Sequence, residues 1–122
     1  MPVVPNTYRG SREYGLAYSA LITAAHSCGM MTYEGIARLT GLPARGAAMA
    51  NRVGRLVGEI SEDEVNCNRP MLSALVVEKN TGLAGKGFFK LAADLRKFTG
   101  KSEAQQKLFL AKEKRKLYEF WK

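Results

Sequence analysis

One stretch of the chain constrains its fold more than any other: residues 47–58, where alanine and glycine are interspersed with cationic and polar side chains. Its small apolar residues recur at the spacing of one face of an α-helix: Ala47, Ala50, Val53, Gly54 and Val57. On such a helix, the side chains of Arg45, Asn51, Arg52 and Arg55 are left to point outward or sideways. We therefore predict a helix with a small inner face and a cationic outer face.

Another helix is predicted just before this one. Thr32 can cap the segment TYEGIARLTG, and Gly41 and Pro43 stop it. The short turn GLPARG then leads into the helix of residues 47–58. Two helices joined by a tight glycine-containing turn, with polar and basic residues on the second, are typical of the helix-turn-helix motif that binds DNA.

The net charge of +8 is unevenly distributed along the chain. Residues 1–85 contain 8 Lys and Arg against 7 Asp and Glu, whereas residues 86–122 contain 11 against 4. A basic segment attracts polyanions, because it neutralises phosphates and releases their counterions. The alternative is a solvated basic tail that contributes only solubility. We favour nucleic acid as the partner.

Composition argues against several other classes of protein. No apolar run is long enough to span a bilayer, and the first residues lack the basic-then-apolar layout of a secretory signal. Two cysteines make no disulfide framework, which favours a cytoplasmic location. With a single histidine, neither a zinc site nor a serine-histidine-aspartate triad can be argued. We expect no metal and no cofactor.

The rest of the chain predicts a mainly α-helical fold with a small β-hairpin or wing. Residues 1–10 predict an extended arm, and a helix follows from a cap at Ser11 to near Gly29. Residues 59–66, EISEDEVN, are interpreted as an exposed acidic connector. The strand-like MLSALVVEK and the glycine-rich NTGLAGKG are typical of a wing, although FFKLAADLRKF after them already has helical spacing.

The domain organisation predicted from these segments is simple. Residues 11–100 form one winged helix-turn-helix-like domain, and residues 101–122 form a basic amphipathic helix that begins at a Ser102 cap and packs on the domain. The apolar residues on one face of that helix are Leu110, Leu117 and Trp121. Its basic face could meet solvent, nucleic acid or an anionic membrane surface, and its aromatic end favours burial or contact with a partner.

Two sequence features, the glycine-rich loop and Cys67, could indicate catalysis, but neither has the neighbouring residues that a catalytic site needs. The glycine-rich loop lacks the spacing of a phosphate-binding P-loop, because Lys86 is followed by Gly87. Cys67 becomes a nucleophile only if a base or a positive field converts its thiol into thiolate. Asn68 cannot act as that base, and the acidic EDE segment opposes the effect of Arg69 on the thiol. We interpret Cys67 as a structural cysteine.

The segments TYEGIA and AMANRVGRLVG together resemble the DNA-binding domain of alkylguanine-DNA alkyltransferases and of the catalytically inactive alkyltransferase-like proteins. The start of the family pattern, T-Y-G-x-[IL]-A, is matched by Thr32, Tyr33, Ile36 and Ala37. Its recognition helix is matched in register by Ala50, Val53, Gly54 and Gly58. Near the position of the family's P-C-H-R motif, Cys67 and Arg69 are present, but the proline and the histidine are not.

The resemblance implies that the helix of residues 47–58 binds the minor groove and that a nucleotide is flipped out of the duplex. Tyr33 would then push on the phosphate of the flipped nucleotide, and Asn51 takes the position of the arginine that inserts into the base stack. That arginine is absent, although Arg52 is adjacent, and Arg55 replaces the asparagine at the helix end.

We therefore predict a non-enzymatic protein that binds duplex DNA, with no catalytic residues. The predicted DNA-binding residues lie on the motif, on the wing and just after it: Tyr33, Arg45, Asn51, Arg52, Arg55, Lys79, Lys86 and Lys90. Two alternatives remain. The first is a small inhibitor or adaptor that binds a protein partner through the basic, aromatic C-terminal helix. The second is an enzyme with Cys67 as its nucleophile.

Overall fold

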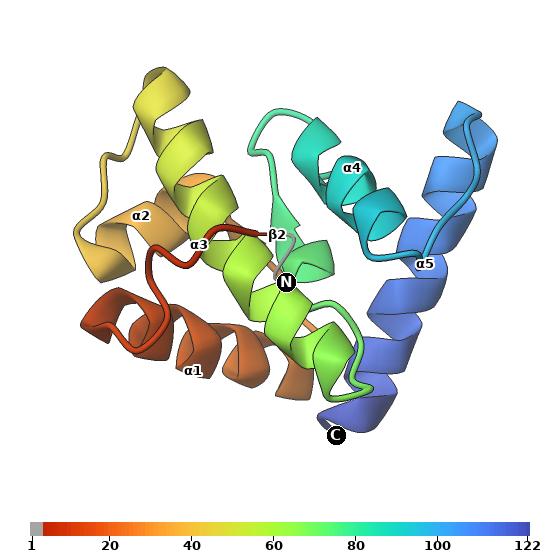
Figure 1. The fold of residues 1–122 in the computed structure, drawn as a ribbon, viewed down its shortest axis with the longest axis horizontal. Coiled ribbons are helices and arrows are strands. Elements are labelled where there is room, and N and C mark those ends of the chain that lie inside the picture. Colours follow the sequence, from red (N-terminus) through yellow and green to blue (C-terminus); the bar gives the residue numbers. More distant parts are fainter. Residues whose placement is uncertain (1–3) are drawn as a thin grey trace.

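A computed structural model describes residues 4–122 of the chain, apart from the side chain of Lys86. Helices make up most of this region, together with a small two-stranded sheet (Figure 1). The elements are α1 (Arg12–His26), β1 (Met31–Thr32), α2 (Tyr33–Thr40), α3 (Gly46–Asn66), the 3-10 helix η1 (Leu72–Leu75), β2 (Val76–Val77), α4 (Lys86–Asp94) and α5 (Glu103–Phe120). The prediction of a mainly helical fold with a small β element is confirmed. Residues 1–3 of the predicted arm lie outside the described residues.

Local sequence signals set the ends of several helices. At the starts of α1 and α2, the hydroxyl groups of Ser11 and Thr32 each accept a hydrogen bond from the backbone N–H three residues later. Ser102 and Gln105 form a reciprocal capping box at the start of α5. Gly41 ends α2 in the left-handed conformation, with φ of 81°. All three predicted caps are confirmed, and each stabilises its helix by about 1 kcal/mol.

Helix α3 is longer than predicted, because it continues through the segment EISEDEVN. The interpretation of residues 59–66 as an exposed acidic connector is wrong, since Glu59, Glu62 and Glu64 are buried. Buried carboxylates are tolerated only where donors from other segments pair with them. The segment is therefore part of the interior, where its charges hold other parts of the chain.

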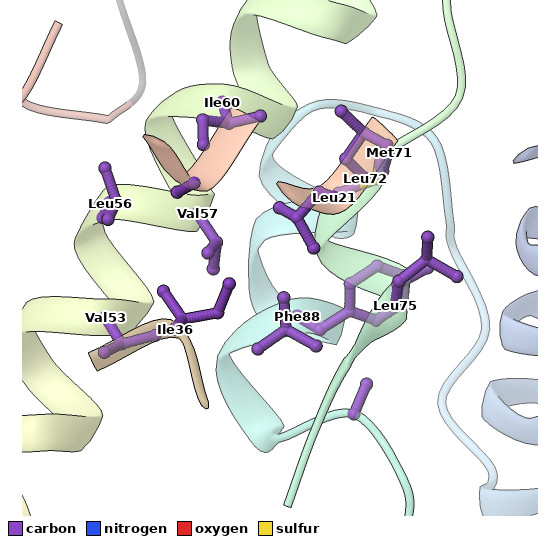
Figure 2. Packing of buried hydrophobic residues seen from close by; sticks show 14 of the residues in the cluster. Leu21, Ile36, Val53, Leu56, Val57, Ile60, Met71, Leu72, Leu75 and Phe88 are labelled. Carbon is purple, nitrogen blue, oxygen red and sulfur yellow. The ribbon is translucent and has the colours of Figure 1, made fainter. Parts of the chain in front are cut away.

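The hydrophobic core lies where α1, α2, α3 and η1 meet (Figure 2). Its largest fully buried aliphatic residues include Leu21 from α1, Ile36 from α2, Leu56 and Ile60 from α3, and Leu72 from η1. Ile36 lies close to Val53, so the core itself joins the two helices of the predicted helix-turn-helix pair. Burial of each such side chain contributes about 1.5–3 kcal/mol. The direction in which α3 presents its outer face is thereby fixed.

The small sheet is parallel and joins distant parts of the chain. Met31 in β1 lies opposite Val76 in β2. The strand-like stretch of residues 71–79 begins as the 3-10 helix η1 and is extended only over β2. The glycine-rich loop of residues 78–85 then leads into α4 and not into a returning strand. The β element therefore ties the entrance of α2 to the exit of η1, and its two strands are not the neighbours of a hairpin.

Helix α5 packs against α1 and η1. Leu110 and Leu117 are buried, and the buried carboxylate of Glu113 between them accepts the backbone N–H of Met71 at 2.9 Å. Tyr118 donates its hydroxyl to the carbonyl oxygen of Gly29. Over the described part of the chain, no helix combines the length and the apolar character needed to cross a membrane.

Candidate nucleic-acid interface

The N-terminal half of α3 carries its polar side chains into solvent. Asn51, Arg52 and Arg55 are exposed, as is Arg45 just before the helix, whereas Val53 on the opposite side is fully buried. Within residues 4–122, no carboxylate lies within ion-pair distance of these three guanidinium groups. The predicted outward orientation of these polar side chains is confirmed. The expectation that Ala47 and Ala50 belong to the inner face is wrong, because both are exposed and the buried part of α3 begins only at Val53. Contact with DNA stays a prediction.

The start of α3 also offers backbone donors. Arg45 occupies the N-cap position, and its side chain makes no capping hydrogen bond. Gly46 enters the helix with φ of 69°, and Ala47 and Ala48 after it are exposed. The first N–H groups of a helix have no partner within the helix and lie at the positive end of its dipole. Such a terminus is suited to bind a phosphate oxygen.

A cavity of about 560 Å³ lies between α3, α4 and the N-terminal segment. Four of the predicted DNA-binding residues line it: Tyr33, Asn51, Arg55 and Lys90. Apolar groups of Val57 and Phe88 form part of its wall, together with the buried residue Ser73. Apolar walls with a few polar groups are typical of sites that hold small ligands. The fold thus brings residues from α2, α3 and α4 to one place.

Tyr33, the first residue of α2, reaches across to the residue that precedes α4. A Cβ atom added to Gly85 would lie 2.9 Å from the Tyr33 hydroxyl oxygen, so this close approach needs glycine. Burial, and to a smaller extent the carboxylate of Glu78, raises the pKa of Tyr33. Its phenol therefore stays neutral at physiological pH and can donate a hydrogen bond at the cavity.

Arg45 and Lys79 lie on the same side of the molecule, around Glu34. The guanidinium of Arg38 donates to Glu34 at 2.8 and 3.0 Å and lowers the pKa of that carboxyl. The charges of Lys79 and Arg45 lower this pKa further, which means that both cations lie near it. The N-terminal end of α3 and the loop of residues 78–85 accordingly extend to the same end of the molecule, at the top of Figure 1.

The lysines of α4 are less fully defined. Lys90 is exposed, and its ammonium lies 3.3 Å from the carboxylate of Asp94 one turn later. Exposed pairs of this kind contribute little stability, so the lysine can exchange its partner for a phosphate at small cost. Lys86 begins α4, but its side chain lies outside the described residues. Its role stays a prediction.

Cys67 lies at the other end of α3 from the cavity. It follows the last residue of the helix and is exposed, about 18 Å along the axis from Arg55. The neighbouring Arg69 donates to the buried carboxylate of Glu64 at 2.8 and 2.9 Å. The interpretation of Cys67 as a structural cysteine stays a prediction.

Sequence reasoning missed the part that the N-terminal segment plays in the site. The buried carboxylate of Glu59 accepts backbone N–H groups from Thr7, Tyr8 and Arg9, at 2.9 to 3.1 Å. These bonds lay the segment across α3, where Val4 lines the cavity (Figure 1). The only signal in the sequence is the density of acidic residues in EISEDEVN, which does not reveal the partner.

Comparisons of the chain with protein-family models, with curated proteins and with solved structures gave no match. The described residues also contain no group of three or more His, Cys, Asp or Glu side chains placed to hold a metal ion. A functional assignment therefore depends on the cations of α3, on the uncapped start of that helix and on the cavity beside it.

Proposed function

We propose that this protein binds duplex DNA, without covalent chemistry, through one face of the α2–α3 pair. We call this the α3 face, and its residues are Tyr33, Arg45, Asn51, Arg52, Arg55, Lys79 and Lys90. The observation that carries the proposal is the exposure of Arg45, Arg52 and Arg55, with no carboxylate partner in the described chain, on a helix that starts with small residues. Cations left unpaired in this way favour a polyanionic partner.

The mechanism follows from the shape of α3. Ala47, Ala48 and Ala50 present only methyl groups, so the backbone of the first turns comes close to the DNA. The N–H groups at the helix start and the side chain of Arg45 contact phosphates, which position the protein without reading sequence. Arg52 and Arg55 contact phosphates or base edges. Lys79 and Lys90 add attraction that does not depend on sequence.

The groove and the mode of binding come from the resemblance to alkyltransferase-like proteins. It places α3 in the minor groove, where recognition depends on the shape of the DNA more than on a base code. The cavity beside α3 then receives a nucleotide turned out of the duplex. Phe88 and Val57 offer apolar contact to its base, Tyr33 donates to its phosphate, and Asn51 fills the space left in the stack.

A salt titration of binding to duplex and single-stranded DNA tests the proposal. In the variant Arg52→Ala/Arg55→Ala, the slope of log affinity against log salt should fall by about 2, because each phosphate contact contributes about one unit. Urea unfolding of the free variant should be unchanged, since both side chains are exposed and make no ion pair among the described residues.

The matched control is Lys107→Ala/Arg115→Ala, which removes the same charge from exposed positions of α5. It should leave the slope nearly unchanged. An equal loss in both variants would mean that binding depends only on net charge, and the assignment of the α3 face would fail. Tighter binding to single strands than to duplex would contradict the assignment of duplex DNA.

The cavity has a test of its own. A duplex carrying a fluorescent base analogue, whose emission rises when it leaves the stack, should brighten when the protein binds. Asn51→Ala should reduce this rise more than it reduces affinity, because Asn51 occupies the vacated space. An unchanged emission at saturating protein would argue against nucleotide flipping, while leaving binding by the α3 face in place.

A further inference from the structure

A groove runs along α5, on the part of the molecule away from the α3 face. In Figure 1, α5 and the linker that leads into it lie at the right, whereas α2 and the N-terminal half of α3 lie at the left. Two cavities, of about 570 and 440 Å³, adjoin α5 and share Lys97 as a lining residue. The residues that we call the α5 groove are Lys97, Phe98, Lys101, Leu108, Lys112, Lys116 and Phe120.

The groove side of α5 is a single helical stripe. Its members recur every four residues, and they are Leu108, Lys112, Lys116 and Phe120. The side of α5 that faces the core is marked by Leu110 and Leu117, which are buried. The stripe begins away from the core at Leu108 and approaches the buried side toward Phe120, which follows Leu117 by three positions. Along it, an apolar residue stands at each end of a pair of lysines.

The exposed chemistry of this stripe is unusual. Leu108 and Phe120 are 58% and 51% exposed, the highest values among the large exposed hydrophobic residues of the described chain. Over residues 4–122, no carboxylate forms an ion pair with Lys97, Lys101 or Lys112. Lys116 differs, because its ammonium lies 3.7 Å from the buried carboxylate of Glu113, and Glu119 also lines the second cavity. The unpaired cations therefore lie at the Lys97, Lys101 and Lys112 end of the groove, beside the exposed side chain of Leu108, which gains free energy when it is covered.

The upper part of the groove is held in shape before any partner arrives. The linker between α4 and α5 passes so close to Phe98 that a Cβ atom on Gly100 would lie 2.7 Å from the phenyl ring. Lys101 and Ser102 both donate their backbone N–H groups to the side chain of Gln105. The ring of Phe98 stacks on Phe109 with 4.9 Å between ring centroids, and both rings line the first cavity.

We propose that the α5 groove binds an acidic amphipathic helix of a partner protein. Carboxylates on that helix pair with Lys97, Lys101 and Lys112, and its apolar side chains cover Leu108 and Phe120. Charge complementarity determines the acidic character, and the position of the lysines between two apolar residues, along an 18-residue helix of about 27 Å, determines the helical form. This second surface leaves the α3 face free.

A single-stranded nucleic acid fits the groove less well. Its bases need open aromatic faces on which to stack. Phe98 and Phe109 stack on each other, and Phe120 packs edge-to-face against Trp121 at 4.9 Å. The most exposed apolar group of the groove, Leu108, has no ring. The groove therefore favours the aliphatic and acidic side chains of a protein.

The test uses the full chain and a synthetic peptide in which Leu and Glu share one helical face, with a scrambled peptide of the same composition. Trp121 is the single tryptophan and contacts Phe120, so its fluorescence reports binding at that end of the groove. The amphipathic peptide should bind saturably, and the scrambled peptide at least about tenfold more weakly. Equal binding of the two peptides, or no binding of either, would overturn the proposal.

Variants separate the groove from general attraction to a basic protein. Lys97→Glu/Lys112→Glu should weaken peptide binding about tenfold or more, whereas the matched reversal Lys107→Glu/Arg115→Glu, at exposed positions of α5 that line neither cavity, should have a much smaller effect. Leu108→Ser should weaken binding without changing the charge. Equal effects of the two charge reversals would overturn the proposal.

Two further measurements separate this groove from nucleic acid and from the α3 face. A single-stranded oligonucleotide of the same charge as the peptide should compete poorly for the groove; if it displaces the peptide at equal concentration, the groove is a nucleic-acid site and the proposal fails. Arg52→Ala/Arg55→Ala should leave peptide affinity intact, so failure of DNA binding and failure of peptide binding are distinguishable.

Discussion

The N-terminal, outer half of α3 and its C-terminal, inner half differ in the environment of their charged side chains. In the outer half, Arg52 and Arg55 are exposed and pair with no carboxylate of the described chain. In the inner half, Glu59, Glu62 and Glu64 are buried, and each accepts hydrogen bonds from another segment. The carboxylates of α3 are already bound by donors from other segments, so they do not pair with its arginines. The arginines therefore remain available to an external partner. Distance from the core, and not overall composition, decides which charges can meet a partner.

The inner half also shapes the outer one. Arg9 donates to Glu62 at 2.6 Å and to Asp63 at 3.0 Å, while the neighbouring backbone N–H groups bind Glu59. This clamp carries Val4 to the wall of the cavity that Tyr33 and Asn51 also line. Acidic residues that bind no ligand thereby help to build the site where a ligand is proposed to bind.

The largest effect is expected when the clamp is broken by Glu59→Gln. The amide offers one oxygen in place of two and sets its own N–H₂ against backbone donors, so a buried site loses charge-assisted hydrogen bonds. We expect the free energy of unfolding, measured with urea, to fall by about 3 kcal/mol. Glu103→Gln, at an exposed position of α5, is the control and should change it by a few tenths. A loss below about 1 kcal/mol would mean that the arm is not clamped.

A smaller loss of folding stability is expected at alkaline pH, and it too involves the carboxylates in the inner half of α3. Tyr14 and Tyr18 of α1 donate their hydroxyl groups to Asp63 and Glu64, at 2.6 and 2.8 Å. Burial first, and then these carboxylates, raises the pKa of both phenols. In the unfolded chain a tyrosine ionises near pH 10. The unfolded state therefore loses its protons first as the pH rises.

The contribution of these phenols to stability is accordingly complete below about pH 10 and is lost as the pH rises toward the folded-state pKa. Urea unfolding at a series of alkaline pH values should show this decline, and the tyrosinate absorbance of the folded protein should appear later than that of the unfolded protein. Tyr14→Phe should make the decline shallower. An identical pH profile for wild type and variant would contradict the assignment.

The contact between Tyr33 and Gly85 can be used to test the structure of the cavity beside the outer half of α3. Gly85→Ala should reduce stability by about 1–2 kcal/mol, because the new Cβ would press on the Tyr33 hydroxyl. In a Tyr33→Phe background the oxygen is gone and the nearest remaining ring atom is 3.6 Å away, so the same substitution should cost much less. The coupling free energy from the double-mutant cycle measures the contact directly. If the effects of Gly85→Ala and Tyr33→Phe on stability are additive, the Tyr33 ring does not contact Gly85 in solution.

The helix starts were predictable because their causes are local. Ser11, Thr32 and Ser102 cap helices through bonds to residues three positions away. The apolar spacing of α3 identified Val53 and Val57 as buried, but not the exposure of Ala47 and Ala50. Packing of α2 and α3, in turn, brings Tyr33, Asn51 and Arg55 to one cavity, which the sequence did not predict. Features that depend on residues a few positions away can be predicted from a single sequence.

The incorrect or missed predictions concern features that depend on residues distant in the sequence. EISEDEVN has the composition of an exposed connector, and nothing nearby indicates that Glu59 is buried by donors about 50 residues earlier. The pairing of β1 with β2 was missed for the same reason, because Met31 meets Val76 through the fold and not through a turn. Val4 and Ser73 line the cavity without any local pattern that marks them as site residues. Binding of DNA by the α3 face stays a prediction.

The smallest effect is expected at the start of α3, where stability and binding should change in opposite directions. Arg45 is an N-cap residue without a capping bond, so Arg45→Ser should stabilise the free protein by about 0.5–1 kcal/mol relative to Arg45→Ala, which removes the same charge and adds no cap. If phosphate binds the N–H groups of this turn, the serine hydroxyl competes for them. Arg45→Ser should then bind DNA more weakly than Arg45→Ala although it is more stable, as measured by urea unfolding and by titration at one salt concentration. Equal affinities of the two variants would remove the helix start from the contact and leave the guanidinium groups of Arg52 and Arg55 as the main binding groups of α3.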